Sequence, residues 1–155
     1  RYDIVFSMVE QDMPSSGIVA RRVFSLQQGV YASPDLISRY GQPNQPQHLD
    51  ELPVVCSSYD SEWGYLTANN SRHSIHIQAP RMRSANAGVR LQAGIAGLGV
   101  VRITSSYCQE AVDKGLLVNI LSDVSWLPIN IYALFPTRRL IPRKVRVFLD
   151  SLLAS

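Results

Sequence analysis

Short apolar runs alternate with helix-like segments along the chain. The runs have the length of buried strands and occur at YDIVFS (2–7), PVVC (53–56), LLVNIL (116–121) and INIYALF (129–135). Helical patterns occur at SPDLISRYG (33–41), SSYCQEAVDKG (105–115) and the apolar stripe after Pro142. Residues 18–32 predict one long extended segment, and residues 63–66 and 74–78 predict two strands around an NNS turn. Strands that alternate with helices predict an α/β fold with a largely parallel sheet.

The segment SANAGVRLQAGIAGLGVV at 84–101 holds four glycines. Ser84 is a suitable N-cap, and Gly97 stands where a left-handed residue ends a helix. The run from 98 to 103 is apolar except for Arg102 and predicts a buried strand. The two glycines inside the helix each cost about 1 kcal/mol relative to alanine. We therefore expect another backbone, or a ligand, to approach this helix closely.

The composition is that of a globular domain, with 46% hydrophobic and 17% charged residues in a chain of 155. The net charge of +3 reflects 15 Lys and Arg against 12 Asp and Glu, an excess too small to indicate nucleic-acid binding. We interpret the basic cluster within 138–146 as a solvated helix face, with a phosphate or partner contact as the alternative. No run approaches the roughly 18 apolar residues of a membrane span, and no secretory signal opens the chain. These features predict a cytoplasmic protein without a membrane partner.

The sequence favours no metal, cofactor or catalytic site. Cys56 and Cys108 lie far apart without ligand spacing, and we expect them to be buried, reduced thiols. His73 and His76 are three positions apart in an expected strand, so their side chains point to opposite faces. The sequence has no nucleophile elbow, phosphate-binding loop or zinc-protease motif. We therefore predict no enzyme activity, no cofactor and no metal ligands.

Several motifs follow one another in order: YDIVFS, YASPDLISRYGQP, the AGLG corner at 96–99, KGLLVNIL and the terminal RKVRVFLDSLL. This ordered set resembles the effector-binding domain of LysR-type transcriptional regulators and covers essentially the whole chain. The chain departs from the family at Thr104, where many relatives have proline, and at Ser7-Met8, where many have arginine. Relatives begin with a winged helix-turn-helix, whereas this chain begins without Met inside an expected strand. We therefore expect DNA contacts only through a missing N-terminal domain and none in this chain.

The resemblance implies a bilobal, periplasmic-binding-protein-like (type II) α/β fold with one lobe complete and the other partial. Residues 1–25 and 119–155 would form the partial lobe I, and residues 26–118 would form lobe II. The effector would bind in the cleft between the lobes, beyond the carboxyl ends of the strands. We expect effector contacts from Ser7, Met8, Ser57, Ser58, Ser84 and Thr104.

Two of these expectations have simpler alternatives. At Ser84, a helix amino end facing the cleft would favour a carboxylate or other anion, and the alternative is a plain helix cap. Ser57 and Ser58 follow a buried strand, where a ligand would be held, and the alternative is an ordinary loop.

We interpret the chain as the ligand-sensing domain of a bacterial LysR-type regulator that binds a small-molecule effector and acts as a homo-oligomer. The first alternative is a solute-binding receptor of a transport system with the same bilobal fold, and the second is an enzyme on that scaffold. A partial lobe I should also expose apolar surface and favour self-association. The residues expected at that surface are Ile4, Phe6, Ile131 and Tyr132.

Overall fold

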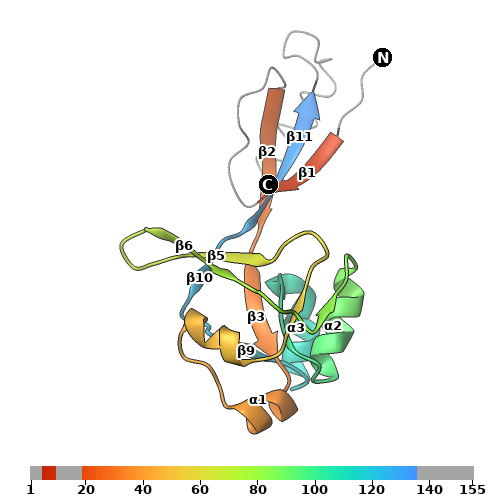
Figure 1. Cartoon of the computed structure of the whole chain (residues 1–155). Helices are drawn as coiled ribbons and strands as arrows, with labels where there is room; N and C mark the ends of the chain where they lie inside the picture. The colour runs from red at the N-terminus through yellow and green to blue at the C-terminus, as the bar shows by residue number, and fades with distance from the viewer. Residues whose placement is uncertain (1–4, 10–18, 136–155) are drawn as a thin grey trace. The chain divides into compact units, whose positions relative to one another are not determined.

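The structure is a computed structural model that describes residues 5–9 and 19–135. The chain forms two compact units, whose elements are labelled in Figure 1. Unit 1 combines residues 1–26 with 128–155, and unit 2 is the continuous segment 27–127.

The described part of unit 1 is an antiparallel sheet with the order β1-β11-β2. Its strands are β1 (Val5–Val9), β2 (Val19–Leu26) and β11 (Ile129–Phe135). The expected exposure of Ile131 and Tyr132 is wrong, because these side chains are only 6% and 7% exposed. Both belong to the central strand β11, so side chains of β1 and β2 flank them on each side. The side chains of Ile4 and Phe6, the basic cluster and the helix expected after Pro142 lie outside the described residues.

The main sheet of unit 2 has the order β7-β4-β8-β3-β9. Its strands are β3 (Gln28–Ala32), β4 (Val54–Cys56), β7 (Met82–Arg83), β8 (Val100–Thr104) and β9 (Val118–Ile120). Only β4 is parallel to its neighbours β7 and β8, whereas β3 is antiparallel to β8 and β9. The expectation of a largely parallel sheet is therefore wrong for β3 alone, which runs opposite to β7, β4, β8 and β9. The register explains this: Gln28 at the start of β3 lies opposite Thr104 at the end of β8.

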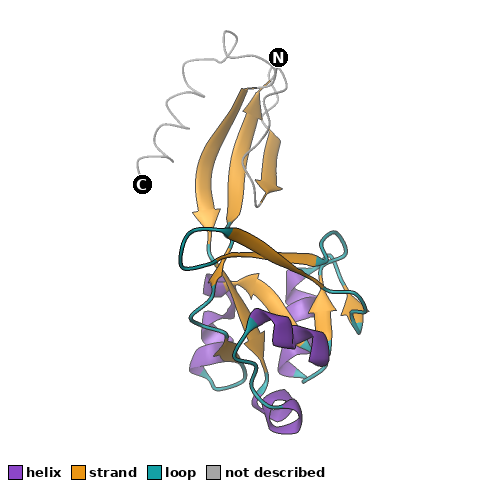
Figure 2. Ribbon diagram, turned by 60° about the vertical axis from the view of Figure 1, so that its left-hand side comes forward, coloured by secondary structure: helices purple, strands orange, loops and turns teal. Residues whose placement is uncertain are grey.

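Figure 2 shows helices on both sides of this sheet, and two hydrophobic clusters cover its two faces. The helical segments are α1 (Pro34–Tyr40), the 3₁₀ helix η1 (Pro46–Glu51), α2 (Ala87–Ile95) and α3 (Ser105–Asp113). Side chains of α2 and α3 pack with Val55 and Val101 in one cluster. In the other cluster, Val54, Cys56 and Val100 pack with side chains from α1, η1 and a second sheet. Residues that alternate along β4 and β8 thus face opposite cores.

The second sheet of unit 2 has the antiparallel order β10-β5-β6. Its strands are β5 (Glu62–Leu66), β6 (Arg72–His76) and β10 (Ser125–Trp126), which confirms the predicted pair of strands around the NNS turn. On this hairpin His73 stacks on Tyr65 and His76 faces Glu62. Within 5–9 and 19–135, no group of three or more potential ligands could hold a metal ion.

The glycine-rich segment forms α2, a tight corner and β8. Asn86 is the N-cap of α2 because its side chain accepts the Val89 N–H at 3.0 Å, so the prediction of Ser84 as the cap is wrong by two positions. Gly97 has the predicted left-handed backbone, with φ of +79°. A Cβ at Gly94 would lie 3.1 Å from the Val101 side chain. At Gly94 the close approach therefore comes from a side chain of β8, not from another backbone.

Candidate functional site

Three parallel strands of unit 2 end at the same side of the sheet. The register pairs Cys56, at the end of β4, with Arg83 at the end of β7, and Val55 with Val101 in β8. Ser57 and Ser84 follow directly after β4 and β7, and Thr104 ends β8. We call this side, formed by the ends of β7, β4 and β8, the carboxyl edge. The structure thus brings Ser57, Ser84 and Thr104 to one edge of one sheet.

The serines at the carboxyl edge shape the backbone around them. The Ser84 N–H donates to the Cys56 carbonyl at 3.0 Å, so β7 and β4 stay paired to their ends. The Ser57 hydroxyl accepts the Tyr59 N–H at 3.2 Å, and the Ser84 hydroxyl accepts the Asn86 N–H at 3.1 Å. Each hydroxyl keeps its own O–H available as a donor.

The other predicted site residues differ in their surroundings. Thr104 is half-buried and is the N-cap residue of α3, but its side chain makes no capping hydrogen bond. Ser58 is exposed in the turn after β4. Ser7 and Met8 lie in β1 of unit 1, opposite Tyr132 and Ile131, and their side chains are outside the described part of the chain. Their contact with an effector stays a prediction.

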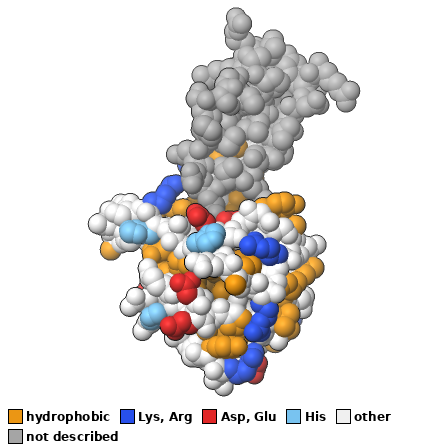
Figure 3. All heavy atoms as spheres, viewed as in Figure 1, with side chains coloured by type: hydrophobic (Ala, Val, Ile, Leu, Met, Phe, Trp, Pro, Cys, Tyr) orange, Lys and Arg blue, Asp and Glu red, His pale blue; other side chains and the backbone are white. Residues whose placement is uncertain are grey.

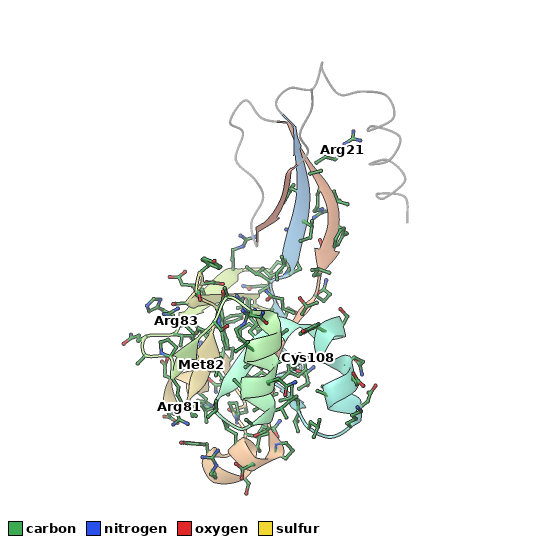
Figure 4. The ribbon with its side chains drawn as sticks, turned by 90° about the vertical axis from the view of Figure 1, so that its right-hand side faces the viewer. Arg21, Arg81, Met82, Arg83 and Cys108 are labelled. Carbon is green, nitrogen blue, oxygen red and sulfur yellow. The ribbon has the colours of Figure 1, made fainter. Side chains whose placement is uncertain are left out.

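Three arginines from different elements meet at the carboxyl edge. Arg83 comes from β7, the outer strand of the sheet, where Figure 4 labels it together with Arg81 and Met82. Arg90 comes from α2 and Arg102 from β8. Burial has the largest effect on the pKa of the Cys56 thiol and raises it, while the charges of all three arginines lower this pKa and that of Asp60 raises it. On the face shown in Figure 3, Lys and Arg side chains of unit 2 lie mostly along one flank.

Arg102 and Asp60 form an ion pair that is largely withdrawn from water. Their N–O distance is 2.6 Å, and their side chains are 7% and 33% exposed. The guanidinium also lies 5.6 Å from the centre of the Trp63 ring, a cation–π contact. The second Asp60 oxygen accepts the Glu62 N–H at 2.8 Å. Asp60 therefore ties the loop between β4 and β5 to β8.

Arg83 and Arg90 have neutral partners instead. Arg83 donates to the Ser57 carbonyl at 3.1 Å and to the Ser61 hydroxyl at 2.6 Å, and Arg90 donates to the Ser84 carbonyl at 2.7 Å. Among the described residues, neither guanidinium contacts a carboxylate. Burial and the neighbouring positive charge of Arg102 lower the pKa of Arg90.

The carboxyl edge therefore carries an excess of positive charge. Its three arginines and one aspartate leave a formal charge of +2. Serine hydroxyls and guanidinium N–H groups are all donors for an anion such as a carboxylate or phosphate. The edge is thus suited to hold an anion, whereas burial raises the pKa of the Cys56 thiol beside it and keeps that thiol neutral.

Only one member of this arginine cluster, Arg102, can be recognised from the sequence. Arg102 interrupts an otherwise apolar run, which marks a charged residue in a buried strand. Arg83, Arg90 and Asp60 stand in polar surroundings in the sequence, and only the register of β7 with β4 and the position of α2 bring them to Arg102. Two hollows of unit 2 contain none of these residues. They lie around the start of β4 and around the loop after α1.

No helix in the described ranges is long and apolar enough to cross a bilayer.

The LysR substrate binding domain family matches residues 1–155. An uncharacterized HTH-type transcriptional regulator of Escherichia coli (strain K12), YhjC, is 28% identical over 145 residues, which cover 90% of this chain and 48% of the relative. DmlR, an HTH-type transcriptional regulator of the same strain, is 25% identical over 138 residues, covering 87% of this chain and 44% of the relative. The chain therefore spans about half the length of the curated relatives it matches.

Solved structures show the same fold. The full-length virulence activator AphB of Vibrio cholerae is 25% identical, with a TM-score of 0.76 over 98% of this chain and 51% of that one. The regulatory domain of AphB from Vibrio vulnificus is 24% identical, with a TM-score of 0.75 over 98% of this chain and 74% of that one. These matches confirm the predicted α/β fold of the periplasmic-binding-protein-like type II class. With the match over all 155 residues, they establish that the chain belongs to the LysR substrate-binding domain family.

Proposed function

We propose that this chain is the ligand-sensing part of a LysR-type transcription regulator and binds a small anionic effector at the carboxyl edge of unit 2. The observation that carries the proposal is the pair of arginines, Arg83 and Arg90, that meets no carboxylate among the described residues and lies beside the Ser57 and Ser84 hydroxyls. Arg90 is half-buried and Arg83 is exposed. Both guanidinium groups have neutral partners among the described residues, so both gain from an incoming anion. The edge also meets the general rule that open α/β sheets bind ligands beyond the carboxyl ends of their strands.

The matched relatives support a proposal for the rest of the regulator. The matched proteins are HTH-type transcriptional regulators about twice as long as this chain. On this proposal, DNA binds a separate N-terminal domain, the protein is cytoplasmic, and it acts as a homo-oligomer. No catalytic step is part of the proposal, because the matched relatives are regulators rather than enzymes. Because these relatives are transcriptional regulators, the comparison favours a regulator over the receptor of a transport system.

The mechanism we propose is a population shift between two arrangements of the lobes. We take unit 2 as lobe II and unit 1 as the partial lobe I. The first boundary of unit 2, 26/27, lies one residue after the expected 25/26, and the second, 127/128, lies nine residues after the expected 118/119. Strands β9 and β10 pair with β3 and β5 of unit 2, so we assign residues 119–127 to lobe II. An effector shifts the population only by the difference between its affinities for the two arrangements.

The test compares two arginines of neighbouring positions. Arg83→Gln should weaken binding of inorganic phosphate about tenfold, because a charge-assisted donor is lost. Arg81→Gln should leave it unchanged, because Arg81 lies two residues earlier in the chain and donates to the Leu98 carbonyl at 3.2 Å, away from the edge. Isothermal titration at constant ionic strength measures both. Equal affinities of both variants and the parent protein would remove the carboxyl edge from the site.

A further inference from the structure

The ion pair of Asp60 with Arg102 places one of the protein's own carboxylates among the donors of the proposed anion site. Building on that proposed function, we infer that Asp60 is an intramolecular competitor of the effector. The anionic group of the effector replaces the Asp60 carboxylate on Arg102, and the loop at residues 57–61 is then released from β8.

The two members of the pair differ in how easily they can leave it. The Asp60 carboxylate is 33% exposed, so water can solvate it when it moves away. The Arg102 side chain is 7% exposed, begins in a central strand and packs over the Trp63 ring. A buried guanidinium left without an anion is strongly unfavourable. Exchange of one anion for another avoids that penalty, and Asp60 is the partner that leaves.

Arginines of the same cluster provide side-chain ties of the loop at residues 57–61, and the Ser61 carbonyl at its end also accepts the Ile77 N–H at 2.7 Å. Arg102 binds Asp60, and Arg83 binds the Ser57 carbonyl and the Ser61 hydroxyl. The Tyr59 side chain, between these contacts, is 87% exposed and adds little packing. An anion that engages both arginines therefore weakens the ties of this loop to β7 and to β8.

Release of the loop reaches the end of unit 2 through the second sheet. The loop continues into β5, where the Gly64 carbonyl accepts the Leu127 N–H at 2.9 Å. In the same sheet the rings of Trp63 and Trp126 make an edge contact at 6.3 Å. Leu127 is the last residue of unit 2 before the chain enters unit 1. A bond exchanged at Asp60 thus acts on the segment that leads out of unit 2, which is a route for regulation.

The experiment titrates inorganic phosphate into the whole chain at constant ionic strength. We expect Asp60→Asn to bind phosphate about fivefold more tightly than the parent protein, because the competing charge is gone. The matched control is Asp35→Asn, which removes the same charge from an Asp35–Arg39 pair on α1 (3.1 Å, side chains 72% and 47% exposed). This control should bind phosphate like the parent.

Chymotrypsin cleavage after Tyr59 reports loop release in the unmodified protein. Phosphate should speed this cleavage in the parent protein, and Asp60→Asn should show fast cleavage without phosphate. Tighter binding with unchanged cleavage would mean that Asp60 acts only through long-range charge, and it would overturn the competitor role. Affinity of Asp60→Asn equal to or below that of the parent would overturn it as well.

Different results would contradict the proposed anion site itself. If no variant binds phosphate, or if Arg90→Gln leaves the affinities of the parent and of Asp60→Asn unchanged, then the carboxyl edge is not the site. Weakened binding in Arg90→Gln, together with no effect of Asp60→Asn, would keep the site and reject only the competitor.

Discussion

At the scale of single residues, burial decides the chemistry of the Cys108 thiol. Cys108 on α3 is 0% exposed, and burial raises its pKa from 9.0 to about 11. At pH 8 only about one molecule in a thousand then carries the reactive thiolate. We predict that a thiol-reactive disulfide reagent leaves Cys108 unmodified in the folded protein and labels it once urea unfolds the chain. Rapid labelling under native conditions would contradict the described packing of α3.

The same raised pKa makes stability depend on pH. The folded protein holds the Cys108 proton to a higher pH than the unfolded chain does, so this stabilisation is complete below about pH 9 and is lost as the pH rises through about 11. A rise of one in the pKa corresponds to about 1.4 kcal/mol of stability. Urea unfolding should therefore show a lower free energy of unfolding at pH 10.5 than at pH 8. Cys108→Ala should reduce this difference in free energy. Part of the difference should remain in that variant, because burial also raises the pKa of Tyr31.

Single residues also show how far the sequence predicts the site. Ser57 and Thr104 are predictable because they stand at the ends of apolar runs. Ser84 is predicted from a different signal, a helix cap, and the pairing of β7 with β4 brings it beside Ser57. Arg102 is visible as a charge in an apolar run, but its partner is not. That partner, Asp60, stands 42 positions earlier, and a sequence without register information cannot bring the two together.

At the scale of elements, the start of α2 rests on one side chain. The Asn86 side chain accepts the Val89 N–H, whereas the Ser84 hydroxyl accepts the Asn86 N–H before the helix begins. We predict that Asn86→Ala lowers the free energy of unfolding by about 1 kcal/mol, the usual cost of a lost cap. Ser84→Ala should cost less than about 0.5 kcal/mol, because Ser84 lies outside the helix. Urea unfolding measures both, and a larger loss in Ser84→Ala would restore Ser84 as the cap.

Gly97 and Gly115 have nearly the same backbone conformation but different surroundings. Comparing them distinguishes the cost of backbone strain from the cost of steric crowding. Gly97 after α2 and Gly115 after α3 have φ of +79° and +74°. A Cβ at Gly115 meets nothing within 4 Å, whereas one at Gly97 lies 3.2 Å from the Ser33 hydroxyl. We predict a loss of about 1 kcal/mol for Gly115→Ala from the left-handed backbone alone, and about 2 kcal/mol for Gly97→Ala. Equal losses in urea unfolding would show that the corner after α2 adjusts without cost.

Most elements are predictable because their patterns are local. The caps of α1, the hairpin of β5 and β6, and the corner at Gly97 follow from residues within a few positions of one another. The direction of β3 is not local, because it depends on where the chain enters unit 2. At this entry the Ser105 N–H donates to the Gln27 carbonyl at 2.8 Å, which fixes the start of β3 beside the end of β8. Strand β7, with two residues, is too short for a periodic pattern.

At the scale of the whole molecule, the two units differ in how the chain builds them. Unit 1 needs segments from both ends of the sequence, because β11 lies between β1 and β2. Unit 2 is one continuous segment from Gln27 to Leu127. It holds two hydrophobic clusters, one on each face of its main sheet. All partners of β3, β4 and β8 in that sheet lie inside the same segment.

We predict from this arrangement that the isolated segment 27–127 folds by itself. Among the described residues, both hydrophobic clusters of unit 2 consist of residues within 27–127. Urea should therefore unfold the segment in one cooperative transition, with an m-value of roughly 1 to 1.5 kcal/mol per molar urea for a domain of this size. The segment contains the whole carboxyl edge and should bind phosphate as the full chain does. Arg83→Gln within it should again weaken binding. A gradual transition, or binding of a dye specific for exposed apolar surface, would show that unit 2 depends on unit 1 for its packing.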